Sequence, residues 1–281
     1  MKNFNTNRRL LLTGLLGAGA CAAIPLRAAE LPAPIFDAHC HIIDPAFPLI
    51  ANQGYLPPAF DLDQYRAVTQ PLGVRAGAVV SGSFQGFDQT YLLAALRRLG
   101  KGWVGVTQLP PDATDADIVS LARAGVRAVR FNLFRGRIEG VDDLLSLAGR
   151  VHNVGGMHAE IYCDAVALRA HVALLSKLPK LVIDHLGMTK EGLPVVLDLV
   201  DAGVRIKATG FGRVTLDVPA ALEAIAARSP DALMFGTDLP STRAPRPFLA
   251  NDIDLLRSVL PGELGDKALW GNALAVYRPE L

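Results

Sequence analysis

The sequence predicts an α/β protein, a single-domain (β/α)8 TIM barrel. Eight short apolar runs, each bounded by turn-forming residues, alternate with helical segments. Continuous apolar strands separated by helices are typical of a parallel sheet covered by helices, and eight such units in roughly 250 residues match a closed barrel. The first run ends in Ala38-His39-Cys40-His41, where a doubly wound open sheet would carry a glycine-rich phosphate loop. We therefore favour the barrel over the open sheet.

The eight expected strands alternate with helices along most of the chain. They lie at residues 35–41, 76–83, 103–109, 126–133, 159–163, 181–185, 204–210 and 233–238. Candidate helix ends support this alternation, because aspartates stand at N-cap positions and glycines stand just past helix termini. The aspartates are Asp88, Asp115 and Asp164, and the glycines are Gly100, Gly125 and Gly203.

The first residues of the chain have the pattern of an export signal. Arg8 and Arg9 precede an apolar run at residues 10–23 that is followed by small residues. The paired arginines resemble a twin-arginine signal, and an ordinary secretory signal is the alternative. We expect residues 1–29 to be the signal peptide, residues 30–281 to be the barrel, and the product to be exported to the periplasm.

Composition and cysteine content exclude several classes of protein. The chain has 281 residues, 51% of them hydrophobic and 20% charged, with a net charge of +1, which fits one soluble, well-buried domain. Its scattered Lys and Arg exclude a nucleic-acid partner and favour a small-molecule ligand. No run after the signal reaches the ~20 apolar residues that span a bilayer. Cys21 lies in the signal, and whether it carries a lipid anchor stays undecided. Cys40 and Cys163 are expected on opposite sides of the barrel, too far apart for a disulfide.

Two histidines near the start of the chain and an aspartate near its end indicate a single site formed by distant segments. Side chains alternate along a strand, so His39 and His41 project to the same face while Cys40 points away. Asp238 ends the eighth run, which a closed barrel brings next to the first. A half-exposed strand that happens to carry two histidines is the alternative for this motif by itself.

Polar side chains collect at the C-terminal ends of the expected strands, where the active sites of this fold lie. They are His39, His41, Ser83, Arg130, Asn132, Tyr162, His185, Arg213 and Asp238. Polar groups at the ends of apolar strands are costly to bury without partners, so their collection at one rim indicates a ligand or a metal. Residues 43–60 and 239–248 follow rim strands and are expected to cover a substrate.

Several rim residues have simpler alternative interpretations. Arg130 has a guanidinium suited to a substrate carboxylate, or it pairs with a local acidic residue. His185 could be a satisfied core histidine. Tyr162 could be an aromatic core residue with its hydroxyl on the backbone, and Ser83 a turn residue.

The motifs together resemble the amidohydrolase superfamily, in particular its amidohydrolase-2 branch of lactonases and decarboxylases. The resemblance rests on Phe36-Asp37-Ala38-His39-Cys40-His41, Val129-Arg130-Phe131-Asn132, Val182-Ile183-Asp184-His185-Leu186-Gly187, Gly236-Thr237-Asp238-Leu239-Pro240 and Trp270-Gly271-Asn272-Ala273. Within that branch, the motifs around Arg130, Tyr162, His185 and Arg213 look like the 2-pyrone-4,6-dicarboxylate lactonase group and its sugar-lactonase relatives.

The resemblance implies roles for the rim residues. Asp238 would be the general base, and His39, His41 and His185 would polarise the lactone carbonyl. Substrate carboxylates or hydroxyls would be held by Arg130, Tyr162, Arg213, Ser83, Asn132 and Arg135. One departure is Met188, which stands where the pyrone-dicarboxylate enzymes usually carry an arginine. We therefore expect a carboxylated or sugar-acid lactone without assigning the dicarboxylate itself.

The sequence leaves the metal and two rival functions open. A carboxylate facing imidazoles in a partly desolvated barrel mouth can deprotonate water for ester hydrolysis without a metal, and this arrangement is favoured. The alternative is one zinc ion on His39, His41 and Asp238. By the resemblance, Arg130 and Tyr162 stand where a two-metal centre would need lysine and histidine. The rival functions are a metal-dependent decarboxylase of the same branch and a periplasmic ligand-binding barrel without catalysis; the oligomeric state stays open.

Overall fold

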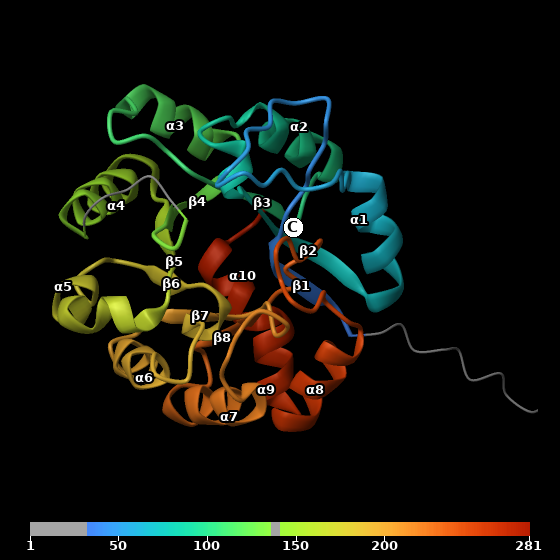
Figure 1. The fold of residues 1–281 in the computed structure, drawn as a ribbon, viewed down its shortest axis with the longest axis vertical. Coiled ribbons are helices and arrows are strands. Elements are labelled where there is room, and N and C mark those ends of the chain that lie inside the picture. The colour runs from blue at the N-terminus through green and yellow to red at the C-terminus, as the bar shows by residue number, and fades with distance from the viewer. Residues whose placement is uncertain (1–32, 136–140) are drawn as a thin grey trace, which may run out of the picture. The chain divides into compact units, whose positions relative to one another are not determined.

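Eight parallel strands lie side by side in the order in which they occur in the sequence, and helices surround them (Figure 1). This is a computed structural model, and it describes residues 33–135 and 141–281. The barrel closes just past the end of the last strand, because the Asp238 amide donates to His39 O at 2.7 Å and the His41 amide donates to Leu239 O at 2.8 Å. The (β/α)8 prediction is confirmed.

The strands are short and almost wholly buried. They are β1 Ile35–Cys40, β2 Val74–Val80, β3 Trp103–Thr107, β4 Val126–Asn132, β5 His158–Tyr162, β6 Leu181–Ile183, β7 Arg205–Ala208 and β8 Leu233–Phe235. The helices are α1 Leu62–Thr69, α2 Thr90–Leu99, α3 Asp115–Arg123, α4 Val141–Gly155, α5 Val172–Leu175, α6 Leu193–Asp201, α7 Val218–Arg228, α8 Asn251–Val259, α9 Glu263–Asp266 and α10 Asn272–Tyr277. Short 3-10 turns lie at Gln70–Leu72, Ser83–Gln85, Ala165–His171 and His185–Gly187, and a π-helical turn lies at Lys267–Gly271.

Every strand ends one to three residues earlier than the sequence predicted, and for β6 and β8 the backbone shows the reason. His185 and Asp238 have φ of 50° and 59°, a left-handed backbone that cannot continue a β ladder. Both residues therefore lie in turns just beyond β6 and β8. Gly236 permits this ending, because a Cβ there would lie 2.7 Å from the His39 amide nitrogen, so only glycine lets the two backbones approach this closely.

The predicted helix starts were right in one case of three. The Asp164 side chain accepts from the Val166 amide and caps the 3-10 turn, as expected. Thr114, not Asp115, caps α3, because its hydroxyl reaches the Asp117 amide while Asp115 already lies in the first turn. Asp88 accepts from the hydroxyl of Thr90 and does not occupy the cap position of α2.

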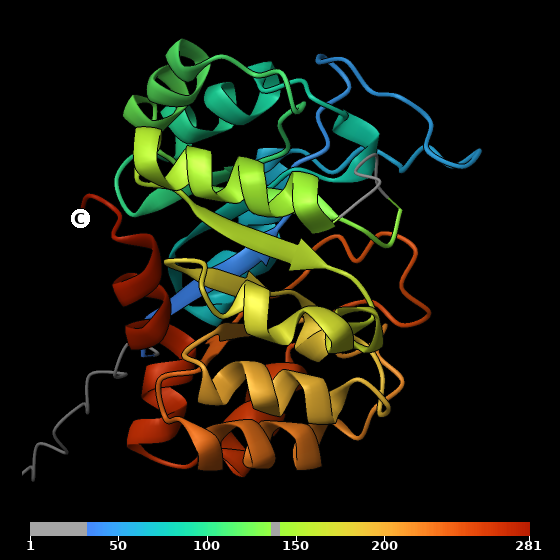
Figure 2. The ribbon, with the colours of Figure 1, turned by 90° about the vertical axis from the view of Figure 1, so that its left-hand side faces the viewer.

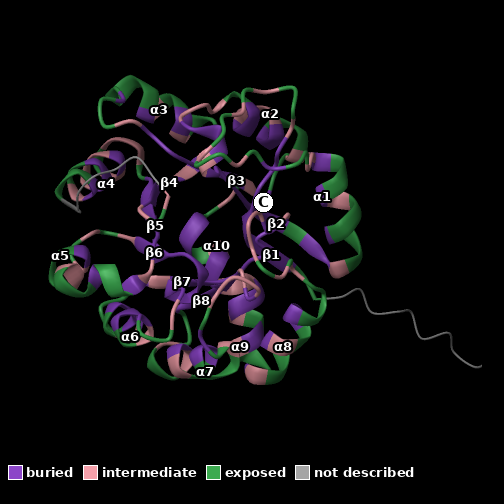
Figure 3. Cartoon of the chain, in the orientation of Figure 1, coloured by how far each residue is buried: buried purple, intermediate pink, exposed green. Residues whose placement is uncertain are grey.

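The apolar core has two layers, one between strands and helices and one inside the barrel. Figure 3 shows the strands buried and the outer faces of the surrounding helices exposed. The inner layer is closed at the N-terminal end of the strands, where Tyr277 of α10 stacks on Phe36 with ring centroids 5.4 Å apart. Figure 2 shows α10 at this end, while the connections at 43–60 and 239–248 project beyond the other end.

The expected signal at residues 1–29 lies outside the described residues. Cys40 and Cys163 are buried free thiols, as predicted. Within the described part of the chain, every helix is too short or too polar to cross a membrane.

Candidate functional site

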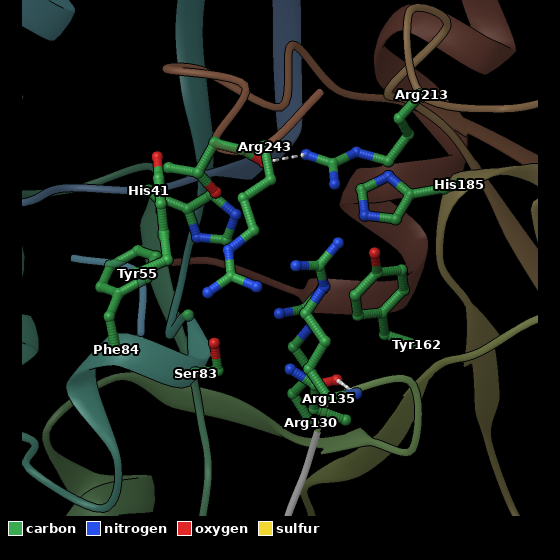
Figure 4. A pocket seen from close by; sticks show the side chains of 13 residues that line it. His41, Tyr55, Ser83, Phe84, Arg130, Arg135, Tyr162, His185, Arg213 and Arg243 are labelled. Atoms are coloured by element: carbon green, nitrogen blue, oxygen red, sulfur yellow. Dashed lines mark hydrogen bonds between the residues drawn. The ribbon is translucent and has the colours of Figure 1, made fainter. Parts of the chain in front are cut away.

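A polar pocket opens at the C-terminal ends of the strands (Figure 4), and its space of about 390 Å³ includes a part that is open to solvent. Its walls come from loops and strand ends all around the barrel. The lining residues are His41, Tyr55, Gly82, Ser83, Phe84, Arg130, Asn132, Arg135, Tyr162, His185, Arg213, Thr242 and Arg243. All six residues expected to bind substrate are in this set, together with two of the three expected histidines. His39 and Asp238 are buried and do not line the pocket, but Asp238 contacts the lining residues His41 and Arg213.

The expected catalytic residues meet around one carboxylate oxygen. Asp238 Oδ1 lies 3.9 Å from His39 Nε2 and 3.8 Å from His41 Nε2. The ring of His185 packs against that of His39, with centroids 4.8 Å apart. Residues at opposite ends of the sequence thus form one cluster, as the sequence predicted.

Burial keeps the three imidazoles neutral. Burial lowers the pKa of His41 to about 3. Burial also lowers the pKa of His39 and of His185 well below the usual value, and nearby cations act in the same direction. For Asp238, burial raises the pKa while the guanidinium of Arg213 opposes the rise. The site therefore combines neutral imidazoles with a carboxylate of increased basicity.

The neutral state fixes which nitrogen of His41 can accept a hydrogen bond. Its Nδ1 lies 2.7 Å from Val80 O, an acceptor, so Nδ1 carries the proton. The lone pair then sits on Nε2 and faces Asp238 Oδ1. Two hydrogen-bond acceptors 3.8 Å apart need a hydrogen-bond donor such as water between them, or a cation that both lone pairs can bind.

Unpartnered polar atoms cluster at this place. Among the described residues, buried atoms without a hydrogen-bond partner include His39 Nε2, His185 Nδ1, Asp238 Oδ1 and the Tyr162 hydroxyl. Such atoms are costly to leave unpaired, so their concentration on one side of the barrel indicates a bound ligand.

Arg213 and Arg130 are each engaged by a buried carboxylate. Arg213 Nε donates to Asp238 Oδ2 at 2.8 Å, and its Nη2 donates to the same oxygen. Arg130 Nε donates to Asp184 Oδ2 at 2.8 Å, and its Nη1 reaches Ser81 O. The alternative weighed for Arg130, a pair with an acidic residue of the protein, is therefore realised, although the residue still lines the pocket.

A buried network below the histidines was missed by the sequence analysis. The Lys207 ammonium contacts Glu160 Oε2, lies 3.3 Å from His39 Nδ1 and 3.4 Å from Asp184 Oδ1, and is fully buried. Burial alone would raise the pKa of Asp184, but Lys207 and Arg130 hold it well below its usual value. A lysine inside an otherwise apolar strand was the available signal, because such a charge must find a partner.

Asp37 was quoted only as part of a motif, yet it joins the two ends of the barrel. Its Oδ1 accepts from the amides of Thr237 and His39, and its Oδ2 accepts from the hydroxyls of Thr237 and Tyr65. These bonds hold the residue before Asp238 against β1. Asp37 thereby fixes the spacing between His39 and Asp238.

Both connections that were expected to cover a substrate contribute to the pocket. Tyr55 comes from residues 43–60, and Thr242 and Arg243 come from residues 239–248. The Arg243 guanidinium stacks over the Tyr55 ring, 4.4 Å from its centroid, so the two connections touch. Arg243 was not among the predicted binding residues.

The donor set also fits a single divalent cation. His39, His185 and Asp238 each place one ligand atom within 4.8 Å of the others. His39 Nε2 and Asp238 Oδ1 have no hydrogen-bond partner among the described residues, so both atoms are free to bind a metal ion. The site predicted from the sequence had His41 in place of His185.

Comparisons with known proteins agree with this geometry. A family model described as "Amidohydrolase" matches residues 36–278. A 2-pyrone-4,6-dicarboxylate hydrolase of Comamonas testosteroni is 29% identical over 283 residues, covering 89% of this chain and 92% of the relative. A 4-sulfomuconolactone hydrolase of Rhizobium radiobacter is 27% identical over 253 residues, with 82% and 83% covered.

A solved structure shares the fold. The apo structure of an Agrobacterium tumefaciens protein superposes with a TM-score of 0.78 at 23% identity, covering 88% of this chain and 97% of the other. At this level of identity the match supports the barrel architecture alone.

Proposed function

The chain belongs to the amidohydrolase family, and from this premise we propose that it opens lactones by attack of a water molecule that Asp238 deprotonates. The observation that carries the proposal is the free Oδ1 of Asp238, which lies 3.8 Å from His41 Nε2. A water molecule that donates to both acceptors would direct its own lone pair toward the pocket. Burial raises the pKa of Asp238, which makes it a better base than an exposed carboxylate.

The remaining residues would stabilise the charge that develops on the lactone carbonyl oxygen. The Tyr162 hydroxyl and the His185 imidazole both have unpartnered polar atoms, and their rings lie 5.0 Å apart. Neutral donors fixed in a buried site stabilise an oxyanion without having to reorganise. Attack of water forms the new C–O bond, Asp238 takes the proton, and the ring oxygen leaves and is protonated, so that one carboxylic acid is released per turnover.

The names of the relatives support an acidic lactone as substrate. One relative is named for a pyrone dicarboxylate and another for a sulfomuconolactone. In this chain the pocket is lined by arginines, and no Asp or Glu is among the described residues that line it. We propose a carboxylated or sugar-acid lactone, with Arg130, Arg213, Ser83 and Asn132 among the residues that hold it.

We propose further that hydrolysis needs no metal. Support comes from the cations already present, since Lys207 lies 3.3 Å from His39 Nδ1 and Arg213 is bonded to Asp238. These positive charges weaken the attraction of the cluster for a second cation. If a divalent cation is bound, His39, His185 and Asp238 would hold it, and it would polarise the carbonyl and lower the pKa of water.

The location of the protein is also a proposal. Arg8, Arg9 and the apolar run at residues 10–23 support export, and cleavage near residue 29 would leave the whole barrel intact. Fusion of residues 1–35 to a reporter tests this directly. Export that depends on the two arginines would support the twin-arginine route, and retention of the reporter in the cytoplasm would contradict export.

A panel of lactones with a pH indicator tests the activity. Acid release from acidic lactones, without release of carbon dioxide, supports the lactonase and excludes the decarboxylase. A barrel that only binds ligands would be stabilised by a lactone but would release no acid.

A further inference from the structure

Three hydrogen-bond acceptors surround the ammonium group of Lys207, as many as its three N–H groups can serve. The ammonium contacts Glu160 Oε2, and it lies 3.3 Å from His39 Nδ1 and 3.4 Å from Asp184 Oδ1. All four side chains are fully buried. An ammonium group between two carboxylates is a compensated charge, so this arrangement is one that a protein interior can hold.

The contact with Lys207 decides where the proton of His39 lies. An ammonium group donates hydrogen bonds and has no lone pair with which to accept one. Nδ1 of His39 therefore carries the lone pair, and the ring proton lies on Nε2. Asp184 Oδ1 also lies 3.4 Å from Nδ1 and would favour the opposite arrangement, but this oxygen has no hydrogen-bond partner among the described residues. Lys207 is thus the group that sets the tautomer.

His39 and His41 consequently present opposite groups to Asp238. His41 donates from Nδ1 to Val80 O, so its Nε2 is an acceptor, whereas Nε2 of His39 is a donor. These two nitrogens lie 3.8 Å and 3.9 Å from Asp238 Oδ1. A water molecule bonded to all three groups would donate to Asp238 and His41, accept from His39, and keep one lone pair for attack.

Resting on the proposed lactone hydrolysis, we propose that Lys207 is a positioning residue that holds the His39 proton on Nε2 and thereby orients the attacking water. The water oxygen forms the new bond to the carbonyl carbon and its proton passes to Asp238, while His39 donates a hydrogen bond and keeps its own proton. The proton on Nε2 also occupies the lone-pair position that a metal ion would need. Lys207 therefore opposes a metal at His39.

Asp184 makes the effect of removing Lys207 specific. Arg130 holds Oδ2 of this aspartate, and Oδ1 remains 3.4 Å from His39 Nδ1. Without the ammonium group, Oδ1 is the acceptor beside Nδ1, so His39 should carry its proton on Nδ1 and a lone pair on Nε2. A histidine that donates from one ring nitrogen to a carboxylate is a common metal ligand through the other. Loss of Lys207 should thus convert His39 from a donor into a metal ligand.

The tautomer of His39 can be measured directly by ¹⁵N NMR of the histidine-labelled full chain. The wild-type protein should show a protonated Nε2 in His39 and a protonated Nδ1 in His41, with the signals of His39 identified by their loss in His39→Asn. The double variant Lys207→Met, Glu160→Gln removes the ammonium together with one counter-charge, so the buried charge stays balanced. His39 should be protonated on Nδ1 in this variant.

Calorimetric titration with zinc gives a second measurement that needs no turnover. The double variant should bind zinc about tenfold or more tightly than the wild-type protein, because groups bonded to a ligating histidine change metal affinity by about 10–100-fold. Tyr277→Phe is the matched control. It removes the 2.6 Å bond from Tyr277 to Glu160 in the same buried network and leaves the contact of Lys207 with His39 intact. It should keep the wild-type tautomer and zinc affinity.

A wild-type His39 that is protonated on Nδ1 would overturn the assignment. A double variant that keeps the wild-type tautomer or the wild-type zinc affinity would overturn it as well. The wild-type spectrum decides the position of the proton even if the double variant does not fold. Because neither measurement involves hydrolysis, a failure of the lactone assay would count against the proposed function and leave this result standing.

Discussion

Arg213 binds one oxygen of Asp238 and leaves the other free. Two nitrogens of the guanidinium reach Oδ2, whereas Oδ1 has no hydrogen-bond partner among the described residues and faces His39 and His41. The carboxylate is thus anchored on one side and available on the other. This division is what a fixed general base requires.

The first prediction concerns Asp238 itself. Asp238→Asn should fold normally, because asparagine tolerates the left-handed backbone at this position and can still accept from Arg213. Its kcat for lactone hydrolysis should fall by about 10²–10⁴-fold, the usual contribution of a general base. Urea unfolding, measured beside the kinetics, separates loss of the base from loss of the fold.

The second prediction concerns Arg213 and pH. The ionised carboxylate is the active form, so activity is lost as pH falls through the pKa of Asp238. Arg213 holds that pKa down against the effect of burial. Arg213→Met should therefore move the acid limb of the kcat/KM profile to higher pH, whereas Arg257→Gln, at an exposed position on α8, should leave it in place. An acid limb that does not move would mean that another group titrates.

The third prediction concerns acid stability. Burial lowers the pKa of His41 to about 3, whereas the unfolded chain titrates near 6.5. A group with a depressed folded pKa contributes stability that is present above the unfolded pKa and is lost as pH falls toward the folded pKa. The free energy of unfolding should fall as pH falls from about 6.5 toward about 3, by up to about 1.4 kcal/mol per pH unit for each such histidine. His41→Asn should reduce the slope by one proton, and an unchanged slope would contradict the buried neutral state.

The fourth prediction concerns Lys207. Removing one partner from a buried ion pair leaves the other uncompensated, so Lys207→Met should lower the free energy of unfolding by about 3–5 kcal/mol. The double variant Lys207→Met, Glu160→Gln should recover part of this loss, because the uncompensated carboxylate is gone. Chemical denaturation of the four proteins in the cycle measures the coupling. Strictly additive losses would show that the pair does not interact.

The sequence predicted the barrel because parallel buried strands are continuous apolar runs, a signal that survives without any tertiary information. It placed the ends of β6 and β8 too late, because the left-handed turns at His185 and Asp238 occur at residues other than glycine. Nothing local in the sequence marks those turns. They are held by contacts such as that of Asp37 with Thr237, which join opposite ends of the chain.

The rim residues were predictable because the C-terminal ends of barrel strands form one surface. Their pairing was not. Whether Arg130 meets a substrate or Asp184 depends on the distance between β4 and the end of β6, which the sequence does not state. The position of Arg243 depends on its stacking with Tyr55, a contact between two irregular connections.

Met188 stands where the pyrone-dicarboxylate enzymes usually carry an arginine, and the structure shows where this residue lies. Met188 is buried and is not among the residues that line the pocket. This position was a reason not to assign the dicarboxylate itself as the substrate. Arg243 brings a cation to the pocket from a different loop, which the resemblance did not cover.

The most direct test of the account is acid release from a panel of acidic lactones, measured on metal-analysed wild-type and Asp238→Asn proteins with and without chelator. Wild-type protein with substoichiometric metal should hydrolyse at least one acidic lactone at a rate that chelator leaves unchanged. Asp238→Asn should remain folded and lose about 10²–10⁴-fold of this rate. Wild-type turnover by Asp238→Asn would contradict the assigned base. Activity that disappears with chelator and returns with zinc would replace the metal-free reaction with one that uses a cation on His39, His185 and Asp238.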